Sequence, residues 1–299
     1  MGSPSEQDAL SLLDQCSCGF MVSQVLFAAC ELGVFDVLAE APEALGLDAV
    51  ATHLGASSRG TELLLDACVS LKLLQVETRG GKALYQNTEL SSTYLVRSSP
   101  RSQHNMLLYL ARTTYLCWAH LAQAVREGRN QYRKAFGVPS DELFSAIYRS
   151  EDEQLQFMRA LQDIWSVQGR SVMAAFDLSP FPLICDLGGD FFRDPLPDAD
   201  LYVLARVLHD WADEKCTRLL ARVHRVCKLG GGVLVIESLL DEDGRGPLTT
   251  QLYSLNMLVQ TEGRERTPAQ YRALLAAAGF RGVQCRMTWG LYGAILARK

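Results

Sequence analysis

The junction at residues 181–189 constrains the fold more than any other stretch of the sequence. A short apolar run at 181–185 leads into the tetrapeptide Asp-Leu-Gly-Gly at 186–189. A strand that ends in Asp-x-Gly-Gly lets the backbone approach a bound adenosyl or dinucleotide group, because glycine has no Cβ to block the contact. The junction therefore predicts an α/β domain with one half of a nucleotide site.

The other half of such a site does not follow in the sequence. Normally a helix comes next, and then a second strand ends in an acidic residue that holds the ribose hydroxyls, roughly 20 residues on. Here only the Pro-rich tract 190–200 separates the first strand from the next one, at 201–204. A parallel crossover needs about a dozen residues or more, usually with a helix. Either the two strands are not parallel neighbours or a βα segment is absent.

Length, charge and composition predict a globular protein of the cytoplasm. The chain has 299 residues, enough for one large domain or two ordinary ones. A net charge of −5 argues against a general binder of nucleic acid or anionic membranes, since both need a basic field. No uninterrupted apolar run reaches the ~18 residues of a membrane span, and residues 1–14 lack the pattern of a secretory signal. The nine cysteines are scattered, so we expect reduced thiols and no zinc or disulfide framework.

Residues 1–96 predict a winged-helix domain, which consists of helix, turn, helix and hairpin. The expected elements are a helix that ends near Gly33, helices at 47–54 and 58–74, and strands at 74–78 and 83–85. Ser57 and Ser58 can cap the longer helix. The paired glycines at 80–81 supply the positive φ angles of a tight hairpin turn.

A winged helix can bind DNA, but the charge of this one is wrong for that role. Residues 1–90 carry twelve acidic side chains against four basic ones. The helix that would read DNA has Glu62 and Asp66 beside Arg59. Because the electrostatic footprint of a DNA-binding surface is missing, we expect the domain to serve in dimerisation or to roof a pocket.

The rest of the chain is predicted to form a helical connecting region at 97–178 and an α/β domain at 179–299. In the connecting region, Ser150 and Glu153 form a capping box before a long helix. The expected strands of the α/β domain are 182–187, 201–205, 233–238, 283–288 and 292–297, and its expected helices are 213–227, 248–260 and 268–278. The last two strands are close enough in sequence to form an antiparallel pair.

His209 is the main candidate for catalysis. It lies just past the second strand of the α/β domain, where open α/β sheets place their reactive groups. Glu237 ends the following strand at the same rim, and Glu265 lies in a loop between two helices. A histidine with a carboxylate partner makes a general base, because imidazole titrates near neutrality and the acid fixes its tautomer. The alternative is a surface histidine that happens to follow a strand.

Several motifs, in their order along the chain, resemble the small-molecule O-methyltransferases of the caffeic-acid type. They are the acidic winged-helix front, the junction 185–192, the stretch 205–211, the glycines 230–232 before a strand, and the loop 262–267. The resemblance covers essentially the whole chain, and within the family it is strongest to the members that methylate acetylserotonin. It implies a winged-helix dimerisation domain followed by a Rossmann-like domain that binds S-adenosylmethionine.

The resemblance also implies a role for each site residue. His209 would take the proton from the 5-hydroxyl of N-acetylserotonin, with Glu237 and Glu265 flanking it, in a reaction that gives melatonin and needs no metal. The residues implied at the acceptor are Asp210, Asn256 and Gln260, and those implied at the cofactor are Tyr148, Trp165, Gly188, Gly189, Asp190, Phe191 and Arg206.

These acceptor and cofactor residues have plainer alternatives. The two aromatic residues on helices could pack between helices. The two amides, four apart on one helix face, could belong to a solvated stripe. Arg206 could be an ion-pair partner of Asp210 or Asp200. The resemblance favours the functional assignment over these alternatives.

The chain departs from the family at the cofactor site. The family has a helix, a ribose-binding acid and a third strand between the positions of Gly189 and Asp190, and this sequence has none of them. Without them we expect weak or absent binding of S-adenosylmethionine, a less stable carboxyl-terminal half and an exposed edge on the first strand. A nicotinamide oxidoreductase ranks a distant third. The glycine fingerprint of such enzymes is incomplete here and the ribose-binding acid is absent, which argues against it.

Two functions follow from this departure. The first is an S-adenosylmethionine-dependent O-methyltransferase that acts on N-acetylserotonin. The alternative is a shortened form with little or no activity that pairs with full-length subunits and regulates them. In both cases the amino-terminal domain is expected to form a dimer, and the first case predicts a homodimer.

Overall fold

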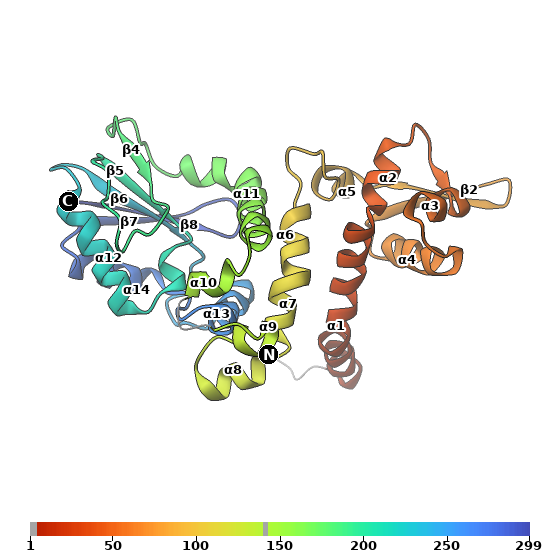
Figure 1. The fold of residues 1–299 in the computed structure, drawn as a ribbon, viewed down its shortest axis with the longest axis horizontal. Coiled ribbons are helices and arrows are strands. Elements are labelled where there is room, and N and C mark those ends of the chain that lie inside the picture. Colours follow the sequence, from red (N-terminus) through yellow and green to blue (C-terminus); the bar gives the residue numbers. More distant parts are fainter. Residues whose placement is uncertain (1–4, 140–142) are drawn as a thin grey trace. The chain divides into compact units, whose positions relative to one another are not determined.

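The computed structural model describes residues 5–139 and 143–299, and these form two compact units (Figure 1). The first unit comprises the described residues up to Thr113 together with Leu155–Ser166, and the second comprises the described part of Thr114–Gln154 together with Val167–Lys299. The long helix α11 (Glu151–Met173) contributes to both units. The predicted domain boundaries at 96 and 178 stay predictions.

The first unit is mainly helical and carries a small antiparallel sheet of strand order β1-β3-β2. Its elements are α1 (Glu6–Leu32), α2 (Val34–Glu40), β1 (Leu45–Gly46), α3 (Leu47–Leu54), α4 (Ser58–Ser70), β2 (Leu74–Arg79), β3 (Lys82–Asn87), α5 (Glu89–Tyr94) and α6 (His104–Tyr109). The β2–β3 turn has positive φ angles at Gly80 and Gly81, of 57° and 76°, as a tight hairpin requires. Two helices followed by this hairpin confirm the predicted winged-helix arrangement.

Helix α4 begins as predicted and ends earlier. The Ser57 hydroxyl accepts the backbone N–H of Gly60 at 3.2 Å, so Ser57 is the cap. The prediction that this helix runs through Leu74 is wrong, because it ends at Ser70. Lys72 then takes a left-handed φ of 59°, which turns the chain into β2.

Helix α1 leaves much of its apolar surface exposed. The large apolar side chains that are at least half exposed are Leu10, Leu12, Leu13, Phe20, Met21 and Val22. By length and composition alone α1 could cross a membrane, and only 11% of its most apolar window is buried. This finding qualifies the sequence prediction, which counted uninterrupted apolar runs. A contact with a partner chain would account for the same exposure.

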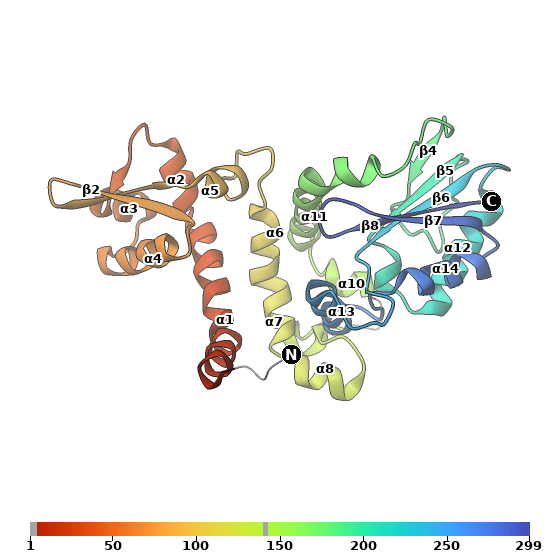
Figure 2. The ribbon, with the colours of Figure 1, turned by 180° about the vertical axis from the view of Figure 1, so that it is seen from behind.

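The second unit is an α/β unit with a five-stranded sheet of order β4-β5-β6-β8-β7. The π-helical turn η1 (Leu110–Thr114) lies at the end of the first unit, and only Thr114 belongs to the second. The elements of the second unit are α7 (Tyr115–Trp118), α8 (Leu121–Glu127), α9 (Tyr132–Phe136), α10 (Leu143–Ile147), β4 (Ile184–Asp186), β5 (Leu201–Ala205), η2 (Leu208–Asp210), α12 (Asp213–Val226), β6 (Gly232–Glu237), α13 (Leu248–Gln260), α14 (Pro268–Ala277), β7 (Arg281–Met287) and β8 (Gly293–Arg298). Helices α12 and α14 lie side by side, and α14 also packs on β7 (Figure 2).

The strand directions place the carboxyl ends of β4, β5 and β6 at one rim of the sheet. These three strands are parallel, whereas β7 and β8 form an antiparallel pair beyond β6. Strand β6 is buried along its whole length and β5 nearly so, as expected for the continuous apolar runs of a parallel sheet. The predicted α/β class and the predicted carboxyl-terminal pair are confirmed.

Strand β4 is a short edge strand. It pairs in parallel with β5, with Ile184 opposite Leu201, so the two strands are neighbours after all. Their connection, residues 187–200, lies wholly within the described chain and contains no helix. Next to β4, Leu183 is 48% exposed, and Ile184 within it is 41% exposed. The predicted exposed edge is confirmed.

Candidate active site

A turn after β5 buries His209. Strand β5 ends at Ala205, and the 3₁₀ turn η2 carries His209, of which only 5% is exposed. Between them Arg206 takes a left-handed φ of 56°, a strained conformation for a residue with a side chain. The alternative of a surface histidine is therefore wrong.

Three carboxylates surround the His209 ring. Its Nδ1 lies 2.8 Å from Oε1 of Glu265 and 3.6 Å from Oε2 of Glu237. Its Nε2 lies 3.6 Å from Oδ1 of Asp210. An ionised carboxylate can only accept a hydrogen bond, so Nδ1 donates its proton to Glu265. In the neutral form of the ring, Nε2 then has a lone pair that can accept a proton.

Burial and charge act on the pKa of His209 in opposite directions. Burial lowers this pKa, but the negative charges of Glu237, Glu265 and Asp210 outweigh burial and raise it to about 10. Burial also raises the pKa of Glu237 and of Asp210, and the charge of His209 offsets part of that rise. The imidazole pKa therefore lies close to the ordinary value of a phenol, about 10.

Glu237 holds the turn that carries His209. Its Oε1 accepts the backbone N–H groups of Val207, Leu208 and His209, at 3.1, 2.8 and 3.3 Å. The side chain is fully buried, so these N–H groups find in Glu237 the acceptor that water cannot provide. Oε2 of Glu237 and Oε2 of Glu265 have no hydrogen-bond partner among the described residues.

The same three side chains could hold a metal ion. One ligand atom from each of His209, Glu237 and Glu265 lies within 4.8 Å of the others. Metal binding through Nδ1 and the hydrogen bond from Nδ1 to Glu265 exclude each other. The hydrogen bond needs a proton on the nitrogen that would bind the metal.

Arg206 and Tyr148 border this cluster. Burial opposes the charge of Arg206, but Tyr292 and the nearby carboxylates outweigh it and raise its pKa. The Arg206 guanidinium carbon also lies 5.7 Å from the centre of the Tyr292 ring. Burial raises the pKa of Tyr148, and the charge of Asp210 adds to the rise. Trp165 belongs to the first unit, so its predicted role at the cofactor stays a prediction.

Asn256 and Gln260 join a polar network that is buried at Gln260 and half-buried at Asn256, so the alternative of a solvated stripe is wrong. Gln260 donates from Nε2 to Oδ1 of Asn256 at 2.7 Å, which places both amides on one face of α13. Trp118 donates its indole N–H to the same oxygen at 2.9 Å, and the Tyr132 hydroxyl donates to Oε1 of Gln260 at 3.2 Å. This network can orient a polar acceptor molecule.

The backbone of the glycine junction is open. Nothing in the described chain lies within 4 Å of a Cβ built on Gly188, and Gly189 has a φ of 72° and meets only the Asp194 carboxylate, at 3.5 Å. Such backbone can approach a ligand, so this part of the site fits S-adenosylmethionine. A ribose-binding acid would need a strand outside β4, and β4 is the edge strand of the described sheet.

The residues after the glycines form a turn that begins at Asp190. Asp190 is exposed, and its carboxylate accepts the backbone N–H of Phe192 at 3.1 Å. Phe191 is buried, with its ring centre 6.4 Å from that of Trp211 in an edge-to-face contact. The turn therefore brings Phe191 to the segment that carries His209.

Comparison with known proteins identifies the class. An O-methyltransferase domain model matches residues 118–190 and 187–281, and an O-methyltransferase dimerisation domain model matches residues 15–97. The chain therefore belongs to the O-methyltransferase family.

Particular relatives are similar over the whole chain. The acetylserotonin O-methyltransferase of Bos taurus is 64% identical over 98% of this chain and 99% of that protein, and the one of Homo sapiens is 61% identical over 100% of both. The crystal structure of human N-acetylserotonin methyltransferase in complex with SAM superposes with a TM-score of 0.97 at 61% identity, over 100% of this chain and 99% of that chain. Mitomycin 7-O-methyltransferase, at 23% identity and a TM-score of 0.82 over 98% of both chains, shows the shared fold alone.

These matches also locate a difference in length. The alignment with the human relative runs over 346 positions against the 299 residues of this chain, so about 47 positions have no counterpart here. The family model is matched in two pieces that meet at residues 187–190. This meeting point is the end of β4, where the sequence predicts an absent βα segment.

Sequence reasoning missed two residues next to the base. Arg266 is 1% exposed and contacts the backbone that carries His209, and Gly263 packs against the same backbone. Both lie in the loop 262–267, which the sequence analysis uses as a family motif without giving either residue a role. The only feature of the sequence that indicates a role for Arg266 is its position next to Glu265. That feature is weak, because an arginine in a charged loop is usually exposed to solvent.

Proposed function

We propose that this chain is an S-adenosylmethionine-dependent O-methyltransferase that methylates the 5-hydroxyl of N-acetylserotonin and so forms melatonin. The observation that carries this proposal is the buried His209–Glu265 pair at the carboxyl end of β5. It occurs in a chain that is 61% to 64% identical to two acetylserotonin O-methyltransferases. The noncatalytic alternative is less favoured, because the complete base cluster is present.

His209 acts on the acceptor hydroxyl through Nε2. The hydroxyl oxygen forms its new bond to the methyl carbon while its proton passes to Nε2, and Glu265 stabilises the imidazolium that results. Bound S-adenosylmethionine supplies a methyl group that its sulfonium already activates. The carboxylates that raise the imidazole pKa make His209 a stronger base toward the acceptor hydroxyl.

Other residues hold the two reactants in line, which contributes most of the remaining rate. Asp210, Asn256 and Gln260 are proposed to bind the acetylserotonin. The residues proposed for the cofactor are Tyr148, Trp165, Gly188, Gly189, Asp190, Phe191 and Arg206. The open backbone at Gly188 supports the assignment of the glycine junction to the cofactor.

The first unit is proposed to form a homodimer. The match to a dimerisation domain over residues 15–97 supports this, as do the exposed apolar side chains of α1. A cytoplasmic location is proposed as well, because the scattered cysteines suit a reducing compartment and are free in the described chain.

Methyl transfer is tested directly with the purified chain. N-acetylserotonin and S-adenosylmethionine labelled in its methyl group are added in excess, and labelled melatonin is measured by mass spectrometry. We expect product from the wild-type chain and a rate ~10² to 10⁴ lower from His209→Gln, the usual effect of losing a general base. His53→Gln is the matched control, since His53 is an exposed helix residue of the first unit, and should leave the rate unchanged.

A thermal melt with and without S-adenosylmethionine separates binding from chemistry, because a ligand of the folded state raises the midpoint. A raised midpoint without any product would contradict the proposed reaction. An unshifted midpoint without product would instead favour the noncatalytic alternative.

A further inference from the structure

Arg266 is the largest fully buried side chain of the described residues, at 1% exposed. A buried guanidinium is tolerated only when its N–H groups are all well paired, because removing the charge from water is costly. Its partners therefore show what the residue holds in place.

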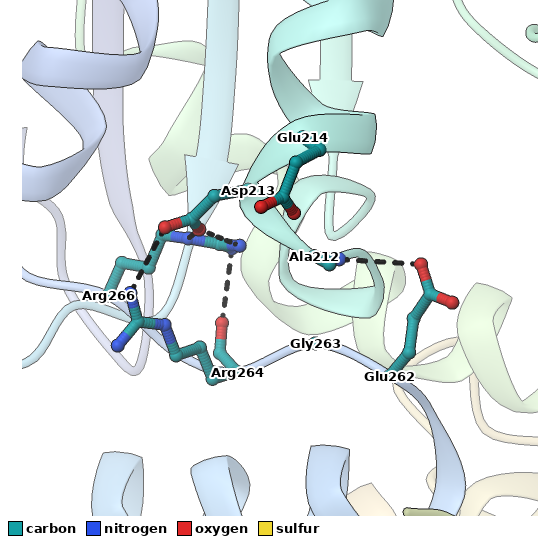
Figure 3. A pocket seen from close by; sticks show the side chains of 7 residues that line it. All are labelled: Ala212, Asp213, Glu214, Glu262, Gly263, Arg264 and Arg266. Carbon is teal, nitrogen blue, oxygen red and sulfur yellow. Dashed lines mark hydrogen bonds and ion pairs between the residues drawn. The ribbon is translucent and has the colours of Figure 1, made fainter.

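Two of these partners are carbonyl groups of the segment that carries His209. Arg266 donates from Nη1 to the Leu208 carbonyl at 2.9 Å and from Nη2 to the Trp211 carbonyl at 2.7 Å. These carbonyls lie on either side of His209 in sequence. Arg266 also donates to Oδ1 of Asp213, from Nε at 2.9 Å and from Nη2 at 2.7 Å. Figure 3 shows Arg266 reaching Asp213 and the Arg264 carbonyl, beside a cavity of about 220 Å³.

The backbone of Arg266 is fixed to a different element. It forms an isolated parallel bridge with Leu239, just past the end of β6, and its carbonyl accepts the N–H of Leu240 at 3.1 Å. Its chain neighbour Glu265 bonds Nδ1 of His209. One residue thus links the end of β6, the carboxylate partner of the base, and the turn that carries the base.

Glu237 and Arg266 bind complementary groups of the same turn. Glu237 accepts N–H groups from Val207 to His209, whereas Arg266 donates to carbonyls on both sides of His209. The loop also packs closely here, since a Cβ built on Gly263 would lie 2.0 Å from the His209 carbonyl oxygen. The turn is therefore held by one buried carboxylate and one buried guanidinium.

We propose that Arg266 is a positioning residue for the methyl-transfer reaction, which holds the His209 turn in register with Glu265 so that Nδ1 stays bonded and Nε2 stays available to the acceptor. This inference rests on the proposed function. Arg266 touches neither reactant in this scheme and acts through the backbone of the turn.

A lysine cannot replace Arg266 in this role. The guanidinium bonds two carbonyls and a carboxylate at once in a fixed plane, whereas an ammonium is a single point of charge on a flexible stem. In Arg266→Lys the turn is expected to shift relative to Glu265. The buried positive charge is kept, so the variant tests geometry more than charge.

The test compares Arg266→Lys with Arg264→Lys. Arg264 lies two residues earlier in the same loop, is exposed, and bonds the same Asp213 at 3.2 Å without a side-chain bond to the His209 turn. For Arg266→Lys we expect kcat to fall at least tenfold while KM for S-adenosylmethionine changes less than twofold. Arg264→Lys should match the wild-type chain in both. Equal rates in all three proteins would overturn the proposal.

A second readout does not depend on activity. The chain has five histidines, and the proton NMR signal of His209 is assigned by its loss in His209→Gln. The titration of His209 reports its distance from Glu237, Glu265 and Asp210, the three carboxylates that face it. We expect the titration midpoint to fall in Arg266→Lys and to stay unchanged in Arg264→Lys. An unchanged midpoint in Arg266→Lys would overturn the proposal, even if the wild-type chain transferred no methyl group and the proposed function had failed.

Asp213→Asn serves if Arg266→Lys does not fold. The Asp213 side chain is 49% exposed, so its isosteric amide should fold while it weakens the anchor of Arg266. We expect both readouts to change in the same direction as in Arg266→Lys but by less. The value of kcat should fall a few-fold, and the titration midpoint of His209 should fall slightly. Wild-type values in both would contradict the proposal.

Discussion

The base cluster and the glycine junction lie at the same rim of one sheet, yet they are built very differently. His209, Glu237 and Glu265 are each at most 5% exposed, and Glu237 bonds the turn that carries His209. At the junction, Gly188 and Gly189 are exposed and meet few atoms of the described chain. The base cluster proposed for the acceptor is buried and fully packed, whereas the junction proposed for the cofactor is packed on one side only.

The position of each strand in the sheet explains this difference. Glu237 ends β6, which has a strand on both sides and is buried throughout. The glycines follow β4, which has a neighbour on one side only within the described sheet. Because parallel sheets normally bury their strands from both sides, a ligand site beside an edge strand lacks the support that a further strand would give.

Removing one carboxylate from the base cluster should give the largest effect. In Glu265→Gln the imidazole loses its bonded charge, and an opposite charge at this distance typically shifts a pKa by ~1 to 3 units. The pKa of His209, raised to about 10 in the wild-type chain, should fall toward 6.5. Only neutral imidazole can act as a base, so the rising limb of kcat/KM against pH should move to lower pH.

The same pair should contribute to stability with a definite sign. A histidine whose folded-state pKa is raised contributes stability that is fully present below its unfolded value of about 6.5 and is lost as pH rises through about 10. The difference in melting midpoint between wild type and Glu265→Gln should therefore shrink between these pH values. Ser57→Ala, which removes the cap of α4 in the first unit, is the control for general destabilisation. Identical pH profiles for wild type and Glu265→Gln would mean that the bond to His209 does not form in solution.

Inserting the missing segment after the glycine junction should strengthen the binding of S-adenosylmethionine. We expect the chain as it stands to bind S-adenosylmethionine weakly. Inserting the corresponding segment of the human relative between Gly189 and Asp190 should lower the dissociation constant ~10- to 100-fold, the value of one or two hydrogen bonds to a charged group. A flexible Gly-Ser insertion of the same length is the control. Calorimetric titration measures both, and equal affinity of the parent and the grafted chain would show that the junction is sufficient by itself.

The sequence predicted the base cluster because strand ends are readable. The runs that became β5 and β6 are continuously apolar, and parallel neighbours bring their carboxyl ends to one rim, so His209 and Glu237 had to be close. Glu265 was placed by the family resemblance. The structure adds that the two carboxylates bond different groups. Glu265 bonds the ring of His209, and Glu237 bonds the backbone of the turn that carries it.

The features that could not be predicted depend on the path of a loop in space. They are the inward turn of Arg266 and the pairing of β4 with β5. The loop 261–267 carries four charged side chains, and nothing in their order tells that Arg266 turns inward while Arg264 stays outside. Likewise the sequence left open whether β4 and β5 are parallel neighbours, because the tract 190–200 is shorter than the usual parallel crossover and contains no predicted helix. Their register settles it as a parallel pair.

The smallest expected effect concerns the edge itself. Ile184→Lys adds a charge to an edge residue that is 41% exposed, so the free energy of unfolding should change by less than ~0.5 kcal/mol, as at other surface sites. Ile236→Lys makes the same change in β6, where the side chain is fully buried, and should cost more than ~3 kcal/mol because the charge has no partner there. Urea denaturation measures both variants, and light scattering should show less self-association for Ile184→Lys, since a charge blocks strand addition at an open edge. If Ile184→Lys destabilised the chain as much as Ile236→Lys, β4 would be covered in solution. The contrast between the buried base cluster and the exposed glycine junction would then be wrong.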